Sequence, residues 1–364
     1  LGLIGGLMIP LLVGFTPTLF SPKAFLLDPG LWLRLIAETR AEITMAPNFA
    51  YHLLARRVDP ADLRGLDLSC LRIALNGAEP IDPETVRAFN RRFAPLGWRP
   101  EAVIGVYGLA EVALGVCVPA PGSGLETDPI DPDRLRGEGV AAPPSPDGQA
   151  REMACAGAPL PGFEVAILDA EGRRLPERQE GAIAVSGPSV MTGYWRSPEA
   201  TARALVDGWL LTGDLGYMAD GKLFVTGREK DLIIRGGRNY HPQELERAAE
   251  TVPGVRGGSA LAFGVPDPAT GTEKVIVAFE TREAETAPIA RAVASAVLAA
   301  TGLRPEVAMP LPPGSAPKTT SGKRQRHEAR ARYMAGTLGQ AEHAMGAIKV
   351  AIGHHLAGWR KASS

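Results

Sequence analysis

The first hundred residues alternate between stretches with helical spacing of apolar residues and short apolar runs of strand length. Helical spacing occurs in residues 29–40, 48–58 and 82–93. Short apolar runs occupy residues 43–47, 71–75 and 102–106. In the third predicted helix, Asp82 is placed to cap the N-terminus and Pro83 takes the first position. Strands that alternate with helices in this way predict a mostly parallel sheet covered on both faces, and therefore an α/β fold.

The opening segment is apolar up to Lys23, so it has to be tested as a membrane span or a signal segment. No basic region precedes it, and its glycines and prolines would interrupt a continuous spanning helix. We therefore expect a buried helix followed by a buried strand, and no membrane span. Because no initiator methionine precedes this segment, we also expect the chain to begin inside a domain.

Between residues 119 and 152 the alternation stops. The segment is polar and rich in proline, and it is far longer than the roughly two to six residues that commonly connect strands and helices. The pattern predicts no helix or strand in it. We interpret it as an insertion of the large domain, the alternative being an ordinary surface loop.

Strand pairs follow the insertion. Residues 163–187 and 216–227 each contain two strand-like runs around turn residues, Glu171-Gly172 in the first pair and Asp220-Gly221 in the second. These pairs predict a β-rich subdomain.

After residue 240, helices and strands alternate again. The predicted helices are residues 242–252 and 287–302, and the predicted strands are residues 259–265 and 274–280. The predicted domains are therefore a large domain over residues 1–228, a small α+β domain over residues 229–335, and a helical tail over residues 336–364. In the tail, the adjacent His354 and His355 point to different faces of a helix, which argues against a metal pair.

Composition and charge narrow the possible functions. The chain is 45% apolar and 22% charged, which is typical of globular proteins. Because 39 Lys and Arg residues face 40 Asp and Glu residues, the net charge of −1 provides no field that would attract nucleic acid. The cysteines Cys70, Cys117 and Cys155 fit neither a zinc knuckle nor a paired disulfide framework, so we expect a reducing, cytoplasmic location.

Four polar motifs are candidates for chemistry. YGLAE (107–111) offers an aromatic face, a glycine that permits close approach of a ligand, and a carboxylate, Glu111, suited to a hard cation. Asp214, between two glycines, is suited to accept hydrogen bonds from a ribose diol, although an Asx-turn explains it equally well. For GREKD (227–231) the alternative interpretation is a solvated charge run. PKTTSGKRQR (317–326) by itself indicates a generic anion-binding patch or simply a basic surface.

The order of six motifs resembles the adenylate-forming superfamily of acyl and aryl ligases. The motifs are NGAEP (76–80), YGLAE (107–111), GYW (193–195), TGD (212–214), GREKD (227–231) and PKTTSGK (317–323). The chain is most similar to the fatty acyl-AMP ligases of that superfamily, on the basis of GLIGG (2–6), APNFAY (46–51), Ala110 within YGLAE, the insertion, GRNYHPQELE (237–246) and PPGSAPKTTSGK (312–323). The resemblance extends from residue 1 to about residue 333.

The resemblance implies a fold and an activity. The fold would be a partial large α/β domain with a β-rich subdomain, followed by a small mobile α+β domain. The activity would be ATP- and Mg²⁺-dependent conversion of a medium- or long-chain fatty acid to acyl-AMP, with transfer to the phosphopantetheine of a carrier protein in lipid, polyketide or lipopeptide biosynthesis. CoA would be disfavoured, in association with the insertion. The alternatives are a CoA-forming acyl ligase and a noncatalytic nucleotide- or acyl-binding remnant.

The resemblance also implies roles for individual residues. Tyr107 would stack on adenine, and the expected nucleotide-binding set also includes Asn76, Gly77, Ala78, Glu79, Gly108 and Leu109. Glu111 would hold Mg²⁺, and Asp214 and Arg228 would bind the ribose hydroxyls. Lys230 would be the hinge and Lys323 the catalytic lysine. The expected acyl-pocket residues are Ile4, Phe49 and Ala50, for which core packing is the alternative interpretation.

Two departures from the family pattern change the expected activity. The sequence contains no Gly/Ser/Thr-rich phosphate loop with its Lys, so the β and γ phosphates lose their backbone cradle. We therefore expect the chain to be a C-terminal fragment of a larger ligase that is weak or inactive alone. Gly157-Ala158-Pro159 stands where relatives often carry Gly-Arg-Pro, so one basic contact is expected to be missing.

Overall fold

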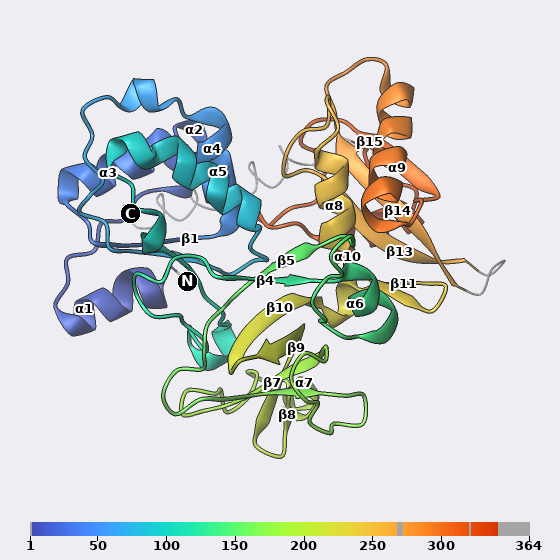
Figure 1. Cartoon of the computed structure of the whole chain (residues 1–364), viewed down its shortest axis with the longest axis horizontal. Coiled ribbons are helices and arrows are strands. Elements are labelled where there is room, and N and C mark those ends of the chain that lie inside the picture. The colour runs from blue at the N-terminus through green and yellow to red at the C-terminus, as the bar shows by residue number, and fades with distance from the viewer. Residues whose placement is uncertain (1, 268–271, 320–321, 341–364) are drawn as a thin grey trace, which may run out of the picture. The chain divides into compact units, whose positions relative to one another are not determined.

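The computed structural model describes residues 2–267, 272–319 and 322–340, and the chain divides into two compact units between Lys230 and Asp231 (Figure 1). The sequence pattern places this boundary at residue 228. Each unit has its own hydrophobic core.

The first unit contains a parallel sheet, a two-stranded ribbon and an antiparallel sheet. Its helices are α1 (Ile9–Val13), α2 (Pro22–Leu27), α3 (Gly30–Thr39), α4 (Asn48–Arg57), α5 (Pro83–Phe93), α6 (Pro132–Glu138) and α7 (Pro198–Ala204). Its strands are β1 (Ile43–Ala46), β2 (Ile73–Asn76), β3 (Val103–Gly105), β4 (Thr127–Ile130), β5 (Arg151–Ala154), β6 (Glu164–Leu168), β7 (Gly181–Ser186), β8 (Leu205–Val206), β9 (Trp209–Ala219) and β10 (Lys222–Arg228).

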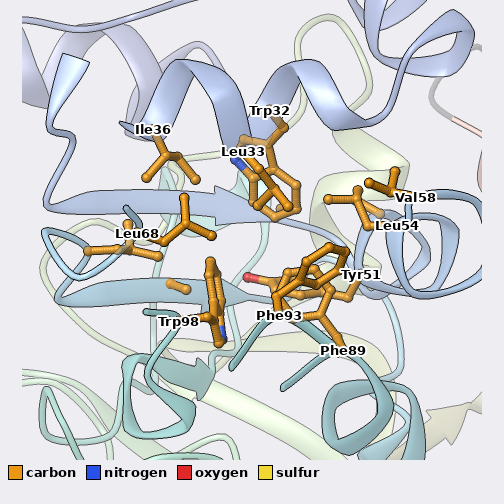
Figure 2. Packing of buried hydrophobic residues seen from close by; sticks show 14 of the residues in the cluster. Trp32, Leu33, Ile36, Tyr51, Leu54, Val58, Leu68, Phe89, Phe93 and Trp98 are labelled. Atoms are coloured by element: carbon orange, nitrogen blue, oxygen red, sulfur yellow. The ribbon is translucent and has the colours of Figure 1, made fainter. Parts of the chain in front are cut away.

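The predicted α/β alternation is confirmed in the first hundred residues. Strands β1, β2 and β3 form a parallel sheet in that order. Helices α3, α4 and α5 pack with these strands in one apolar cluster, in which the rings of Trp32, Tyr51, Phe89 and Trp98 meet at their edges (Figure 2). The side chain of Asp82 accepts a hydrogen bond from the Thr85 amide at 3.3 Å, as expected for the N-cap of α5.

The opening segment differs from the prediction of a buried helix followed by a buried strand. A helix does form, because a π-helical turn (η1, Ile4–Met8) runs into α1. However, Leu11 is 63% exposed and Leu12 is 80% exposed, and residues 14–21 contain no strand. The helix ends at Gly14, whose φ of 80° terminates it in the left-handed conformation. The apolar composition of this segment thus predicted that its side chains are buried, but the described residues provide no surface against which they could pack. Within them, no helix combines the length and apolarity needed to cross a bilayer.

The segment 119–152 is more ordered than its composition predicted. It contains β4, α6 and the start of β5, and β4 pairs with β5 in antiparallel register. Ile130, Leu135 and Met153 bury their side chains in a small cluster with Tyr217 and Phe224 of β9 and β10. These elements are short and depend on that packing for stability, which explains why the local pattern did not reveal them.

The predicted β-rich subdomain is confirmed. The antiparallel order is β10-β9-β7-β6, with β8 added to β9. Asp220 and Gly221 connect β9 to β10 with φ of 51° and 69°, the left-handed pair of a tight hairpin turn. This hairpin sets the register in which Asp214 of β9 faces Arg228 of β10.

The second unit contains the predicted helices and strands together with a hairpin, a strand and a helix (α10) that the pattern missed. Its elements are β11 (Ile233–Arg235), β12 (Arg238–Tyr240), α8 (Pro242–Glu250), β13 (Leu261–Asp267), β14 (Thr272–Glu280), α9 (Thr286–Thr301), β15 (Val307–Leu311) and α10 (Arg326–Met334). Strand β14 lies between antiparallel β13 and parallel β15. Of the predicted helical tail over residues 336–364, residues 336–340 contain turns and no helix, and the rest lies outside the described residues.

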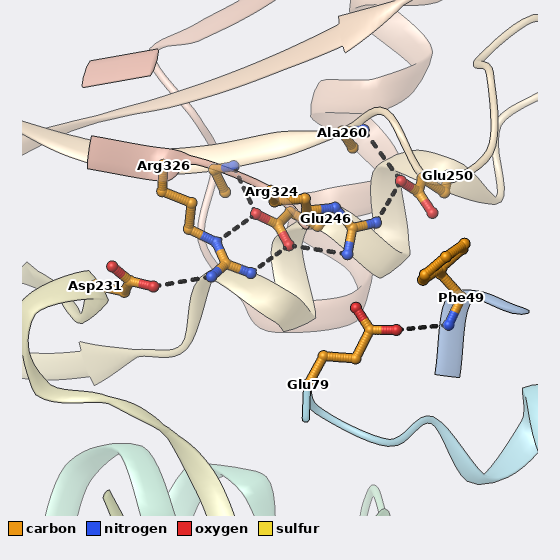
Figure 3. Close-up of polar contacts among 9 residues, drawn as sticks. Phe49, Glu79, Asp231, Glu246, Glu250, Ala260, Arg324 and Arg326 are labelled. Atoms are coloured by element: carbon orange, nitrogen blue, oxygen red, sulfur yellow. Dashed lines mark hydrogen bonds and ion pairs between the residues drawn. The ribbon is translucent and has the colours of Figure 1, made fainter. Parts of the chain in front are cut away.

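A buried ion-pair network joins α8 to the start of α10 (Figure 3). Arg326 donates two hydrogen bonds to Glu246, at 2.7 and 2.8 Å, and a third to Asp231 at 2.9 Å. Arg324 donates to Glu250 at 2.7 Å. The Glu246 side chain is 1% exposed, so its charge depends on these arginines for compensation.

Removing the Glu246 charge should therefore destabilise the second unit. We expect Glu246→Gln to lower its free energy of unfolding by about 3–5 kcal/mol, the usual effect of leaving a buried ion-pair partner uncompensated. Hydrogen exchange of the β13 and β14 amides would measure this change. Glu328→Gln, which removes a half-exposed pair with Arg332, is the control and should change stability by less than about 0.5 kcal/mol. Equal protection of the amides in both variants would contradict the prediction.

Candidate functional site

Two loops of the first unit meet at one edge of the parallel sheet. Strand β2 ends at Asn76 and strand β3 ends at Gly105, and their carboxyl ends lie at the same edge. The Val106 amide donates to the Asn76 carbonyl at 2.8 Å, which joins the loop after β2 to the loop after β3. The edge at the carboxyl ends of parallel strands is where α/β sheets bind ligands.

The loop after β2 has a constrained backbone. A Cβ on Gly77 would lie 2.7 Å from the Val106 carbonyl oxygen, so only glycine fits there. Ala78 adopts a φ of 66°, which is unfavourable for a residue with a side chain. Unfavourable backbone that is held by its surroundings occurs most often at functional sites.

Asn76 contributes a buried acceptor to this edge. Its side chain is fully buried, and its Nδ2 donates to Asn48 Oδ1 at 3.3 Å. Its Oδ1 has no hydrogen-bond partner within the described part of the chain. A buried oxygen without a donor is costly, so this atom is suited to accept a hydrogen bond from a bound ligand or water.

Glu79 has a structural contact that its predicted role did not include. Its Oε1 accepts a hydrogen bond from the Phe49 amide at 2.5 Å, at the start of α4 (Figure 3). A carboxylate at the N-terminus of a helix is stabilised by the free amides and the helix dipole. Glu79 therefore fixes the start of α4 relative to the loop after β2.

The three expected acyl-pocket residues have different environments. Ala50 is 4% exposed and belongs to the aromatic core, so core packing explains it. Phe49 is partly buried at the edge of this core, with its ring 6.3 Å from that of Phe25. Ile4 is half-buried in η1. A cavity of about 220 Å³ in this unit lies instead along α5 and residues 123–127, and none of the predicted site residues lines it.

Tyr107, Asp214 and Arg228 form one hydrogen-bonded network. The Tyr107 hydroxyl donates to Asp214 Oδ2 at 2.9 Å, and Arg228 Nε donates to Asp214 Oδ1 at 2.9 Å. The Asp214 amide donates to Thr212 Oγ1 at 3.1 Å, and the Thr212 hydroxyl donates to the Ile183 carbonyl at 2.8 Å. The network thus joins the loop after β3 to the antiparallel sheet.

Burial dominates the electrostatics of this network. It raises the pKa of Tyr107, and the neighbouring Asp214 charge acts in the same direction, so the hydroxyl stays a donor. Burial also raises the pKa of Asp214, although the Arg228 charge and the Tyr107 hydrogen bond oppose this. An ionised carboxylate has about four acceptor positions, of which these two donors use two. Asp214 can therefore accept further hydrogen bonds from a ligand diol.

Glu111 lies in a short helical turn, η5 (Ala110–Val112), and is held by a residue to which the sequence analysis gave no role. The Tyr194 hydroxyl donates to Glu111 Oε1 at 2.8 Å. Tyr194 belongs to the GYW motif, so the sequence contained a signal for it, but eighty-three positions separate the two residues in the chain.

Glu111 is suited to bind a magnesium ion whose other ligands come from a substrate and water. Within the described residues, no group of three or more His, Cys, Asp or Glu side chains could hold a metal ion. Protein Mg²⁺ sites commonly consist of one or two carboxylates together with substrate phosphates and waters. Glu111 is half-exposed and its Oε2 is not used by Tyr194, which meets that requirement.

In the second unit, the PKTTSGKRQR segment separates into structural arginines and available lysines. Arg324 and Arg326 are engaged by the acids of α8, as described above. Lys323 makes no ion pair within the described residues, and its amide donates to Thr319 Oγ1 at 3.0 Å. Lys318 also lacks an ion pair there, and burial lowers its pKa. The described part of this segment therefore holds two structural arginines and two lysines without an ion pair, of which Lys318 is largely buried.

Lys230 is exposed and is the last residue of the first unit. Asp231, the next residue, pairs with Arg326 in the second unit. The predicted hinge residue thus coincides with the division between the units, while the rotation itself stays a prediction.

The chain is similar in sequence and in fold to known proteins. A protein of Caulobacter vibrioides, provisionally named an acyl-CoA synthetase, is 38% identical over 93% of this chain. The long-chain-fatty-acid–AMP ligase FadD26 of Mycobacterium marinum is 37% identical over 92% of the chain. A structure from a study of fatty acyl-adenylate ligases of E. coli and L. pneumophila superposes with a TM-score of 0.86 at 37% identity over 92% of the chain.

The chain spans 60% of the length of each of these three proteins. The family model described as AMP-binding enzyme matches residues 1–195, which is more than half of the chain. The chain therefore belongs to the family of AMP-binding enzymes.

Proposed function

We propose that this chain is part of a ligase that uses ATP to convert a medium- or long-chain fatty acid to acyl-AMP. The observation that carries the proposal is the Tyr107–Asp214–Arg228 network, at the sheet edge that also holds the unpartnered Asn76 oxygen. The names of the ligases that the chain resembles support the fatty acid as the substrate class.

The residues of the first unit suit the nucleoside. Asn76 Oδ1 is an acceptor for an amine such as that of adenine, and Gly77 permits close approach of a ring to the backbone. Tyr107 offers an aromatic ring whose position is fixed by Asp214. Asp214 and Arg228 offer an acceptor and a donor to the ribose hydroxyls. Such positioning converts an encounter into an in-line attack on the α-phosphate.

Charge neutralisation is the main requirement of the chemical step, because a carboxylate must approach a phosphate. Lys323 has no ion-pair partner among the described residues. Its ammonium group can therefore stabilise the negative charge that develops in the transition state. Mg²⁺, when bound through Glu111, would neutralise the phosphate oxygens from the other side. The proposal includes rotation about Lys230, which would bring Lys323 to the reaction and withdraw it afterwards.

The second stage of the proposal is transfer of the acyl group to the thiol of a carrier-protein phosphopantetheine in the cytoplasm, with CoA disfavoured. A CoA-forming reaction is the second candidate, and the name of the Caulobacter relative favours it. The two differ in whether acyl-AMP persists when CoA is present. A noncatalytic remnant would bind AMP or acyl-AMP without turnover.

Because the sequence lacks a phosphate loop and spans 60% of its relatives, activity should be measured on the protein expressed from its complete reading frame. Products of ATP, Mg²⁺ and a mixture of C12 to C16 fatty acids would be followed by mass spectrometry, with and without CoA. Acyl-AMP that persists with CoA is the expected result. Conversion to acyl-CoA would favour the second candidate, and the absence of any adenylate would overturn both.

Replacing Lys323 tests the catalytic cation. We expect Lys323→Ala to lower the rate of acyl-AMP formation by about 10²–10³-fold, the usual effect of removing one group that stabilises transition-state charge. Lys318→Ala is the matched control, since it removes the other unpaired lysine of the same segment. If both variants lost activity equally, the segment would act as a general anion-binding surface and the assignment of Lys323 would be wrong.

Replacing Asp214 tests the nucleoside contacts. Asp214→Asn keeps the side-chain volume but removes the charge, and hydrogen bonds to charged groups contribute about 1.5–3 kcal/mol. We therefore expect the KM for ATP to rise by about 10- to 100-fold, together with a lower kcat, while the KM for the fatty acid changes little. Asp220→Asn at the exposed β9–β10 turn is the control. An unchanged KM for ATP in the Asp214 variant would remove this residue from the nucleotide site.

A further inference from the structure

The segment between β7 and α7, residues 187–197, is fastened to the turn that carries Glu111. The Ser189 hydroxyl donates to the Val112 carbonyl at 2.7 Å, and the Met191 amide donates to the Glu111 carbonyl at 2.7 Å. The third contact is the hydrogen bond from the Tyr194 hydroxyl to Glu111 Oε1 at 2.8 Å. Two of these contacts fix the backbone of η5, and the third fixes the carboxylate.

Tyr194 is itself held in place by the start of α7. Its amide donates to Thr201 Oγ1 at 2.9 Å, and the Thr201 hydroxyl donates to the Ser197 carbonyl at 2.9 Å. Gly193 permits this approach, since a Cβ there would lie 2.8 Å from Thr201 Cγ2. The backbone of Tyr194 is therefore held by α7, independently of its contact with Glu111.

Stability alone does not account for the contact. Tyr194 is 40% exposed, and it lies outside the core cluster of the antiparallel sheet. Water competes for a hydrogen bond at such a site, so its net contribution to folding is small. The contact instead affects the conformation of Glu111. A free glutamate side chain samples many rotamers, and a hydrogen bond to its Oε1 restricts them.

We propose that Tyr194 is a positioning residue that orients the Glu111 carboxylate so that Oε2 is presented to a divalent cation. The inference rests on the proposed function, in which Glu111 binds the cation that accompanies ATP. Hydrogen bonds that orient a metal-binding side chain typically change metal affinity by about 10- to 100-fold. Because Glu111 is the carboxylate assigned to Mg²⁺ and the described residues contain no cluster of three or more metal-ligating side chains, the orientation of Glu111 directly affects the affinity for the cation.

The test is Tyr194→Phe in the protein expressed from its complete reading frame. The dissociation constant of Mn²⁺, used as the probe, would be measured by water-proton relaxation with a nonhydrolysable ATP analogue bound. We expect about tenfold weaker Mn²⁺ binding, with unchanged affinity for the analogue without cation and an unchanged Tm. The Mg²⁺ concentration for half-maximal acyl-AMP formation should rise by the same factor.

Two further variants make the result specific. Trp195→Phe changes the neighbouring side chain, which is 86% exposed, and should leave Mn²⁺ binding unchanged. Thr201→Val leaves the Tyr194 hydroxyl in place but removes the hydroxyl that accepts a hydrogen bond from the Tyr194 amide. It should weaken Mn²⁺ binding less than Tyr194→Phe does.

Three outcomes would overturn one of the two ideas. Unchanged Mn²⁺ binding in Tyr194→Phe would overturn the positioning role while leaving the proposed function intact. Parallel losses of Mn²⁺ binding, cation-free analogue binding and Tm would mean that Tyr194 is merely structural, which also overturns that role. If the wild-type protein bound neither the analogue nor Mn²⁺ and made no acyl-AMP, the proposed function itself would be wrong.

Discussion

The hydrogen bond between Tyr107 and Asp214 is the contact on which the candidate site depends. It joins a loop of the parallel sheet to a strand of the antiparallel sheet, so two separately formed layers supply one site. Burial keeps Tyr107 protonated as a donor, and Arg228 compensates the charge of Asp214. Each of the three side chains is thereby held in a geometry that none would keep alone.

In both units, ion pairs and hydrogen bonds distinguish the charged side chains that stabilise the structure from those that can still bind a ligand. In the second unit, Glu246 and Glu250 engage the two arginines of the PKTTSGKRQR segment, while Lys323 is left without an ion pair among the described residues. In the first unit, Asp214 and Glu111 each keep acceptor capacity after their protein contacts are counted. In the proposed function, Lys323 would neutralise charge between the two reacting anions, while Asp214 and Glu111 would bind the ribose and Mg²⁺.

The segments that sequence analysis interpreted least well are those whose order comes from packing. Residues 119–152 read as a polar insertion, yet Ile130 and Met153 anchor β4, α6 and β5 against Tyr217 and Phe224. The opening helix shows the opposite error, because its apolar residues predicted burial and most of them are exposed. The composition of a segment indicates which side chains it could bury, whereas the neighbouring surface determines whether those side chains are buried.

The sequence by itself determined the βα alternation, the β-rich hairpins, the Asp82 cap and the motifs around Tyr107, Asp214 and Lys323, because period, turn chemistry and motif order are local properties. Only the tertiary structure decided that Tyr107 meets Asp214, that Tyr194 holds Glu111, and that Arg324 and Arg326 are structural. Those contacts join residues 80 or more positions apart in most cases, and their partners are fixed by strand register and burial, which no local pattern encodes.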